Sequence, residues 1–397
     1  MIVMCTVCFE SYGEKNYMGV KYEYSLGKSY LCHLLKKLHN NTSMYKILSI
    51  NPGSTSTKFA VYEDEKLVCL HTIRHTAEEL KIYPNLFDQY EFRKNLMLDY
   101  LKKDDIDLSD LSAVVGRGGL VRPLESGVYK VNDKLILDLK SSLGGEHASN
   151  LGGVLAKEIA DGIPNCQAFI ADPIVVDEMQ DVARISGLPL FPRRSTFHAL
   201  NHKAIARKYA AATGVTYEEL NLVIVHLGGG VSVAAHEKGK VIDTNQALDG
   251  FGPFSPERAG TLDAGVLVEM CFEGKYTRDE IHKMLVGNGG LVAHLGTNEV
   301  LVVLQRIEDG DVHAKLVLEA MCYNIAKEIG AMLAVLHGKA DAVILTGGIA
   351  RSKFVVDYIK EMVSAMAKVV VYPGEDEMDA LAMSGLRVLR GEKSKIY

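Results

Sequence analysis

Residues 46–63 read KILSI-NPGSTST-KFAVYE, two apolar strands joined by a turn rich in glycine, serine and threonine. Residues 222–237, LVIVH-LGGGVS-VAAHE, repeat this arrangement in the second half of the chain, and the strand VIDT follows after one more turn. Each copy is followed by helix-like segments and further apolar strands. We therefore predict an α/β protein of two similar domains that each open with such a hairpin, although amphipathic hairpins can also resemble one another by coincidence.

The segments around these hairpins support the same fold class. Helical apolar spacing is present in Leu151–Ala160, His198–Ala212 and Ala314–Leu336, and a short strand, Ala168–Asp172, ends in an acid before a proline. The first convincing strand starts just after Met44. We expect residues 1–43, which hold three of the seven cysteines, to be an unassigned extension, either a misplaced start or a loosely attached arm.

Composition excludes several classes of protein. The net charge is −6 over 397 residues, which argues against a general nucleic-acid binder because such proteins neutralise phosphates with basic side chains. The sequence contains no apolar run long enough to predict a membrane span and no typical signal peptide. Seven scattered cysteines do not predict a disulfide framework, so we expect a cytoplasmic protein.

Three glycine-rich strand ends predict a bound nucleotide. The turn that begins at Asn51 offers backbone N–H groups, the hydroxyls of Ser54 and Ser56 and the cation of Lys58, all suited to an oxyanion, although a polar hairpin loop would look similar. The second strand end is formed by Gly228, Gly229 and Gly230, where bare backbone can lie against phosphate oxygens. The third is formed by Gly347 and Gly348 before a helix start, which is a favourable place for an anion.

Four further segments concentrate polar side chains. Arg117 lies in the flexible segment VGRGG, and Asp172 ends a strand where a magnesium ligand would suit the edge of a sheet. His198 and His202 are four residues apart on one helical face; they could bind zinc, but the glutamate of the metalloprotease pattern is absent. Glu377 belongs to an acidic turn before the last helix, where acids also stabilise a helix start.

Ten segments, spread from residue 44 to the C-terminus, together resemble a known family. They are INPGSTSTKFAVYE, VGRGGLVRP, GEHASNLGG, ADPIVVDEM, RRSTFHALNHKAIA, HLGGGVSVAAH, LDGFGPFSPERAGTLDAG, GNGGLVAHLGTNE, LTGGIARSKF and YPGEDEMDALAMSGLRVLRG. The chain is similar to the acetate kinase family of the acetate/sugar kinase, Hsp70 and actin superfamily, and most similar to its butyrate kinase branch. The resemblance implies two ribonuclease-H-like domains around a central cleft. Residues 44–172 with 373–397 would form the N-terminal domain and residues 173–372 the C-terminal, nucleotide-binding domain.

The resemblance also implies reversible phosphoryl transfer from ATP to butanoate, with Mg²⁺, giving butanoyl phosphate and ADP. By this resemblance the catalytic residues are Asn51, Arg117, Asp172, His198 and Arg258, and the substrate is bound by Arg117 and His147. The phosphates would lie against the triple glycine, and adenosine would contact Gly347, Gly348 and Ile349. Mg²⁺ would be held by Asp172 and Glu377, with Glu375 as the alternative to Glu377. At least a homodimer is implied.

Two departures from the acetate kinase pattern favour the butyrate kinase branch. Leu262 stands where acetate kinases carry an arginine after Gly-Thr, so Arg258 is expected to take that place. Val300 and Leu301 follow Asn298-Glu299, where acetate kinases have Phe-Arg. Acetate, propionate or a branched-chain acid is the alternative substrate. A non-catalytic nucleotide-switched scaffold or chaperone, as the superfamily also contains, is the less favoured alternative, because Arg117, Asp172, His198 and Arg258 all stand where the chemistry would need them.

Overall fold

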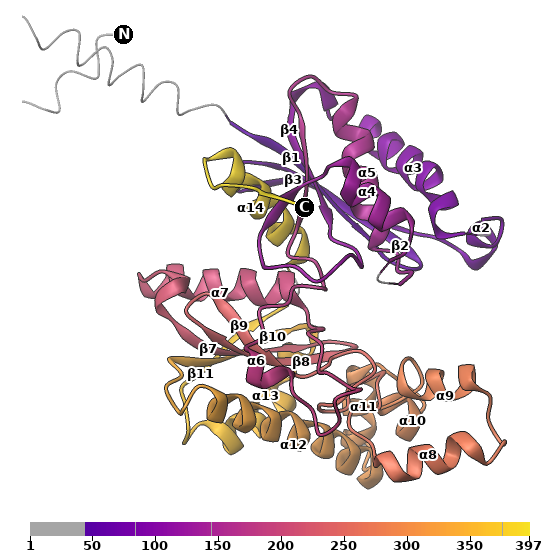
Figure 1. The fold of residues 1–397 in the computed structure, drawn as a ribbon, viewed down its shortest axis with the longest axis vertical. Helices are drawn as coiled ribbons and strands as arrows, with labels where there is room; N and C mark the ends of the chain where they lie inside the picture. Colours follow the sequence, from indigo (N-terminus) through magenta and orange to yellow (C-terminus); the bar gives the residue numbers. More distant parts are fainter. Residues whose placement is uncertain (1–43, 84, 144, 375) are drawn as a thin grey trace, which may run out of the picture. The chain divides into compact units, whose positions relative to one another are not determined.

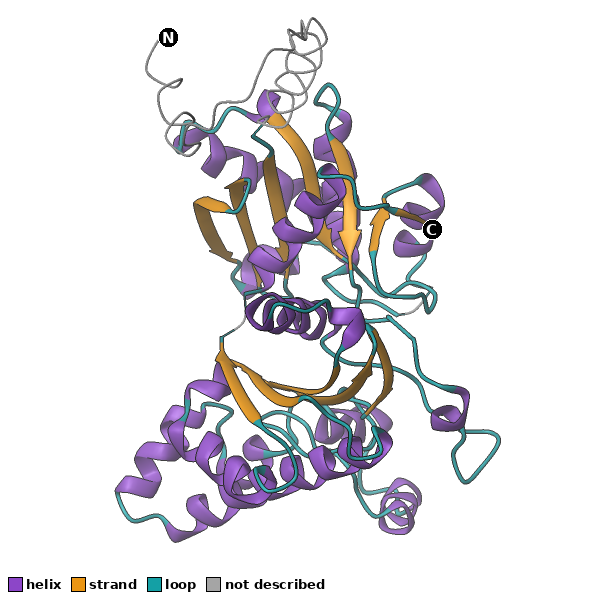
Figure 2. Ribbon diagram, turned by 90° about the vertical axis from the view of Figure 1, so that its left-hand side faces the viewer, coloured by secondary structure: helices purple, strands orange, loops and turns teal. Residues whose placement is uncertain are grey.

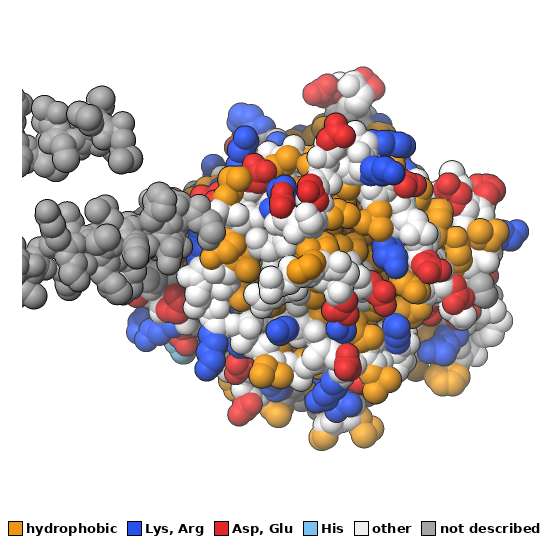
Figure 3. Space-filling model, turned by 90° about the horizontal axis from the view of Figure 1, so that it is seen from above, with side chains coloured by type: hydrophobic (Ala, Val, Ile, Leu, Met, Phe, Trp, Pro, Cys, Tyr) orange, Lys and Arg blue, Asp and Glu red, His pale blue; other side chains and the backbone are white. Residues whose placement is uncertain are grey.

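The computed structural model describes residues 44–83, 85–143, 145–374 and 376–397 (Figure 1). The expectations for residues 1–43 and for Glu375 lie outside these residues. Contacts group Tyr45–Tyr397 into one compact unit. Within the described residues no helix has the length and apolar character that a membrane span requires. On the face in Figure 3, acidic and basic side chains lie interspersed with apolar ones, so this face carries no large field of one sign.

Two sheets form the framework, and they share a five-stranded core, which β5 and β12 extend in the first sheet. The first has the order β12-β5-β6-β4-β1-β2-β3 and the second the order β11-β10-β7-β8-β9. The strands are β1 (Lys46–Pro52), β2 (Ser56–Glu63), β3 (Lys66–Arg74), β4 (Leu111–Arg117), β5 (Val128–Lys130), β6 (Gln167–Ala171), β7 (Asn221–Leu227), β8 (Val231–Glu237), β9 (Lys240–Thr244), β10 (Ala342–Gly347), β11 (Val369–Pro373) and β12 (Lys395–Ile396). In each sheet an antiparallel three-stranded meander is extended by two parallel strands. The predicted α/β fold with a repeated hairpin is confirmed.

Helices pack on both faces of these sheets (Figure 2). They are α2 (Ala77–Lys81), α3 (Tyr90–Lys103), α4 (Asp133–Lys140), α5 (Asn150–Asp161), α6 (Asp181–Arg184), α7 (Ala199–Thr213), α8 (Ala264–Phe272), α9 (Arg278–Leu285), α10 (Leu291–Leu295), α11 (Val300–Glu308), α12 (Val312–Val335), α13 (Lys353–Val363) and α14 (Glu377–Leu389). The three helices predicted from apolar spacing are present as α5, α7 and α12, with ends shifted by one or two residues. Helix α7 ends at Gly214, whose φ of 74° is a conformation that glycine adopts without strain.

Alternating side chains give the first sheet two buried faces. Leu48 and Ile50 of β1 pack toward α3, α4 and α5, whereas Ile47 packs toward α14. Figure 1 shows α14, in yellow, beside the indigo strands, although its residues come from the far end of the chain. Gly385 allows this approach, because a Cβ there would lie 2.6 Å from Val115 Cγ2. The C-terminal helix thereby delivers its first residue, Glu377, to the ends of β1 and β4.

Candidate active site

The ends of β1, β4 and the start of α14 bring Asn51, Arg117 and Glu377 together. Asn51 Nδ2 donates a hydrogen bond to Glu377 Oε2, and Arg117 Nη1 lies 3.3 Å from Glu377 Oε1. The same Arg117 nitrogen donates to Asn51 Oδ1 at 3.3 Å. Because β1 and β4 are parallel neighbours, their carboxyl ends meet at one edge of the sheet. Three residues that the sequence separates by up to 326 positions therefore form one polar cluster.

Arg93, a residue that the sequence reasoning missed, holds the turn after Asn51 in place. Its guanidinium is fully buried and donates to the carbonyl oxygens of Gly53 and Ser56, both at 2.9 Å, and of Ser54 at 3.1 Å. These bonds turn the carbonyl groups of the loop inward. Arg93 lies on the buried face of α3 together with Met97. A charged residue on an otherwise apolar helical face is the sequence feature that could have pointed to this role.

The side chains of this turn remain accessible to a ligand. Ser54 is exposed, while Ser56 and Lys58 are half-buried. Lys58 lies opposite Asn51 in the register of the β1–β2 hairpin. The turn thus presents hydroxyls and one cation next to the cluster of Asn51, as an oxyanion would require.

The triple glycine after β7 is shaped around Arg258. A Cβ on Gly230 would lie 1.9 Å from Arg258 Nη1, so only glycine leaves room for this guanidinium. Arg258 donates to the carbonyl of Ala247, and burial lowers the pKa of its guanidinium. Ser255 Oγ donates to the carbonyl of Gly229 at 2.7 Å, which fixes the middle of the loop. Gly228 is buried and Gly229 exposed. The loop therefore carries one arginine close to bare backbone.

The glycine pair at the end of β10 lies against the end of β7. Gly347 has a φ of 90°, and a Cβ on it would lie 2.3 Å from the carbonyl oxygen of Leu227. Gly347 also exchanges two backbone hydrogen bonds with Gly374, at 3.1 and 2.9 Å. Gly348 is exposed with open space around it, and Ile349 is half-buried. These bonds connect the predicted adenosine segment to the acidic turn that leads to Glu377.

Four of the predicted residues line one cavity of about 480 Å³. They are Arg117, His147, His198 and Arg258. The remaining wall includes apolar side chains, namely Leu120, Val121, Pro123, Ile174, Val175, Phe197 and Leu248. Arg194 and two acids, Asp177 and Asp249, also line it. A cavity that combines three guanidinium groups with aliphatic side chains suits a small anion that carries an apolar tail.

The two histidines of this cavity are held differently. His147 is exposed, and its Nδ1 accepts a hydrogen bond from Ser149 N at 3.2 Å. His198 is the N-cap residue of α7, and its Nδ1 lies 2.9 Å from Ser232 Oγ. The His198 ring stacks on His226 with centroids 3.8 Å apart. His198 is consequently fixed on both its edge and its face, while His147 borders solvent.

Asp172 lies one residue beyond β6, but its carboxylate is directed elsewhere. Its Oδ1 accepts hydrogen bonds from Ser126 Oγ at 2.6 Å and Gly127 N at 2.8 Å, and its Oδ2 lies 3.6 Å from Arg207 Nη1. The carboxylate is 1% exposed and lines a second cavity, of about 330 Å³, between α7 and α14. Asp172 is therefore not part of the hydrogen-bonded cluster of Asn51, Arg117 and Glu377.

The two acids predicted to hold a metal lie in different surroundings. Carboxylate and amide oxygens are the ligands that Mg²⁺ prefers, and Glu377 and Asn51 present such oxygens side by side. Asp172 Oδ1 accepts two hydrogen bonds, whereas its buried Oδ2 has no hydrogen-bond partner in the described part of the chain and lies 3.6 Å from Arg207 Nη1. Among the described residues, one other group could accept a metal. It consists of Cys69 and His71 on β3 and Asp104 at the end of α3, and it contains none of the predicted site residues.

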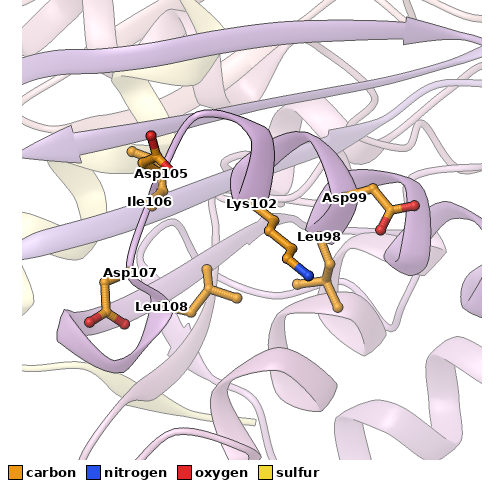
Figure 4. A pocket seen from close by; sticks show the side chains of 7 residues that line it. All are labelled: Leu98, Asp99, Lys102, Asp105, Ile106, Asp107 and Leu108. Atoms are coloured by element: carbon orange, nitrogen blue, oxygen red, sulfur yellow. The ribbon is translucent and has the colours of Figure 1, made fainter.

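A further hollow lies on the surface at the end of α3 (Figure 4). It is lined by Leu98, Asp99, Lys102, Asp105, Ile106, Asp107 and Leu108. All seven residues belong to α3 and the segment after it, and none is a predicted site residue. The hollow carries three acids and one lysine, so it offers little to an anionic substrate.

Comparison with known proteins identifies the family and supports the fold. The family model of the acetokinase family matches residues 189–396. The fold is similar to that of an acetate kinase from Porphyromonas gingivalis, with a TM-score of 0.72 and 19% identity over 87% of this chain and 100% of that one. It is also similar to a propionate kinase from Francisella tularensis subsp. tularensis, with a TM-score of 0.68 and 20% identity over 85% of this chain and 98% of that one.

Proposed function

The chain belongs to the acetokinase family, and we propose that it transfers the γ-phosphoryl group of ATP reversibly to butanoate, giving butanoyl phosphate and ADP. Carboxylate kinase activity with ATP or ADP and a divalent metal is the activity of this family. The choice of butanoate is our proposal. It is supported by the cavity that combines Arg117, His198 and Arg258 with an aliphatic wall, which is the single observation that carries the proposal.

The size and lining of this cavity favour an acid longer than acetate. Leu120, Val121, Ile174 and Val175 offer apolar surface that a methyl group would leave largely uncovered. Each additional buried methylene contributes about 0.8 kcal/mol. Two methylenes would thus favour butanoate over acetate by about 1–2 kcal/mol in binding, provided that the carboxylate keeps its place at the arginines.

The chemistry requires cations more than a base. A carboxylic acid with a pKa near that of Glu is ionised at pH 7, so the nucleophile needs no proton acceptor. The obstacle is to bring this anion against the γ-phosphate and to stabilise charge on the transferring group. We assign the carboxylate to Arg117 and His147, and the phosphoryl oxygens to Arg258 and His198.

The nucleotide and metal sites follow the glycine-rich ends. We propose that Ser54, Ser56 and Lys58 and the backbone of Gly228, Gly229 and Gly230 hold phosphates, and that Gly347, Gly348 and Ile349 contact adenosine. Glu377, beside Asn51, would hold the divalent metal, which supplies charge neutralisation on the phosphates when bound. Asp172 lies outside the cluster of Asn51, Arg117 and Glu377 and would act on the metal from there. Residues 44–172 with 373–397, and 173–372, remain our proposed domains.

Assembly and location are part of the proposal. Helix α8 has no buried residue, and Val266, Val268 and Phe272 on it are 62%, 55% and 87% exposed. Such an unpaired apolar helix supports contact with a second copy of the chain. Replacement of Phe272 by Glu would then shift the molar mass measured by light scattering toward the monomer. The cysteines of the described residues, all free thiols, support a cytoplasmic location.

The reaction class can be tested by trapping the product. With ATP, Mg²⁺ and butanoate, hydroxylamine should convert butanoyl phosphate into a hydroxamate in proportion to the ADP released. ADP release that is slow and independent of added acid would instead identify the nucleotide-switched scaffold, and would overturn the proposal.

A further inference from the structure

Behind His198 a line of hydrogen-bonded side chains runs away from the cavity into the protein. His198 Nδ1 lies 2.9 Å from Ser232 Oγ, and this oxygen lies 2.8 Å from His202 Nε2. His202 Nδ1 lies 3.2 Å from His236 Nε2, and His236 Nδ1 lies 2.6 Å from the hydroxyl of Tyr217. Ser232, His202 and His236 are fully buried and Tyr217 is 4% exposed. We call these five residues the histidine chain.

The histidine chain is built from neutral rings. The contact between His202 and His236 joins two ring nitrogens, so one of them must be unprotonated in order to accept. Burial lowers the pKa of both rings and of His198. The cation of Lys203 further lowers the pKa of His202 and His236. Its Nζ lies 5.4 Å from the centre of the Tyr217 ring and 2.6 Å from Glu178 Oε2. Each neutral ring then has one donor and one acceptor. Ser232 Oγ has two acceptor positions, and the backbone N–H of His198 already uses one of them at 3.4 Å, so the hydroxyl cannot also accept from both rings. The hydrogens of the chain therefore point either toward His198 or toward Tyr217.

Tyr217 decides between these two directions. In the described part of the chain its hydroxyl has one hydrogen-bond partner, the His236 ring. If His236 donated to Tyr217, the phenolic proton would be left without an acceptor in a buried place, at a cost of about 1–3 kcal/mol. If Tyr217 donates, every buried donor inside the chain is used: His236 donates to His202, His202 to Ser232, and Ser232 to His198 Nδ1. The one donor left over, His198 Nε2–H, belongs to the residue that lines the cavity, where a ligand can accept from it.

From this direction we propose that Tyr217, His236, His202 and Ser232 are positioning residues that keep the ring proton of His198 on Nε2. His198 then presents a donor to the transferring phosphoryl group rather than a lone pair, which would repel phosphoryl oxygens. The functional consequence rests on the proposed function, whereas the position of the proton does not. A histidine held in the wrong tautomer can cost an enzyme up to about 10⁴ in rate.

The position of the ring and that of its proton are controlled separately. The His198 ring stacks on His226 at an angle of 17°, and His226 Nδ1 lies 3.0 Å from Asn201 Oδ1. This stack remains when the hydroxyl of Tyr217 is removed. Tyr217→Phe therefore changes the direction of the hydrogen bonds without removing the packing that orients His198.

The proton can be located by NMR on protein with ¹⁵N-labelled histidine, from the two-bond couplings between ring nitrogens and carbon-bound protons. We expect His198, His202 and His236 of the wild type to carry their protons on Nε2. A proton on Nδ1 of His198 would overturn the proposal. In Tyr217→Phe we expect His236 and His202 to show both tautomers; unchanged single tautomers would contradict the role of Tyr217. Tyr209→Phe, in the same apolar cluster but outside the histidine chain, is the control and should leave the spectra unchanged.

Steady-state kinetics supply the second measurement. We expect kcat to fall about 10-fold or more in Ser232→Ala and several-fold in Tyr217→Phe, with KM for ATP within twofold of the wild type. An unchanged kcat in Ser232→Ala would overturn the proposed effect on the reaction. A wild type without carboxylate-dependent turnover would contradict the proposed function instead, and the spectra would still decide the tautomer.

Discussion

Arg117 Nη1, at the end of β4, lies 3.3 Å from Glu377 Oε1 at the start of α14. This ion pair joins a residue expected to bind the acid to a residue expected to bind the metal. The pair is partly exposed, with side chains 22% and 17% accessible, so both groups can exchange one partner for a ligand. The ion pair therefore connects the proposed acid-binding residue at the end of β4 with the proposed metal-binding residue at the start of α14.

Replacement of Arg117 by alanine should remove the cation at the acid. We expect kcat to fall by about 10²–10³, while the KM for ATP stays near that of the wild type, because the phosphate loops do not depend on this side chain. Steady-state kinetics with ATP and with acid varied in turn would measure both. A variant with unchanged turnover would remove Arg117 from the mechanism.

Glu377→Gln and Asp172→Asn should separate the two acids predicted to act on the metal. Loss of a carboxylate ligand weakens a cation site strongly, so we expect Glu377→Gln to raise the Mg²⁺ concentration for half-maximal activity tenfold or more. Asp172→Asn should raise it less, because its carboxylate lies outside the hydrogen-bonded cluster of Asn51, Arg117 and Glu377. Equal shifts in a Mg²⁺ titration would instead place Asp172 on the metal.

The contact between Gly230 and Arg258 predicts a specific effect of one methyl group. Gly230→Ala would place its Cβ 1.9 Å from Arg258 Nη1 and should displace the guanidinium, with a loss of about 10²-fold in kcat. Gly330→Ala, within α12, is the matched control because nothing lies within 4 Å of its Cβ position. It should keep full activity and raise the unfolding midpoint slightly. Full activity of Gly230→Ala would contradict this assignment.

Stability should fall on mild acidification. Burial lowers the pKa of His75 to about 4 and holds the pKa values of His202 and His236 well below 6.5. Below pH 6.5 the unfolded chain therefore binds protons that the folded chain does not, and the free energy of unfolding decreases as pH falls toward 4. Each group should contribute a loss of about 1 kcal/mol by pH 5.5. Calorimetry at pH 7.5, 6.5 and 5.5 would show this, and a midpoint that does not fall would contradict it.

The parts of the site that lie at strand ends could be predicted from the sequence. The hairpin turns at Asn51 and at Gly228 are local patterns, and parallel pairing of the strands brings their ends together. Glu377 joins them because an apolar helical face carries α14 back onto the first sheet. In each case the signal lies within one segment.

Other parts depend on contacts that no local pattern contains. Arg93 reaches a turn 37 to 40 residues earlier in the chain, and Tyr217 acts on His198 through side chains of two further elements. The orientation of the Asp172 side chain could not be predicted from the sequence either, because its φ of 35° turns the side chain out of the alternation of β6. Hydrogen bonds between buried polar groups that are far apart in the chain are therefore the hardest part of the site to predict from the sequence.

The central claim is the preference for butanoate, and kcat/KM over the straight-chain acids from two to five carbons, with ATP and Mg²⁺ saturating, tests it most directly. The two additional methylenes of butanoate together contribute about 1–2 kcal/mol in such a cavity, so we expect kcat/KM to rise from acetate through propionate to butanoate, with butanoate about 10-fold above acetate. A kcat/KM that is highest for acetate would contradict the claim.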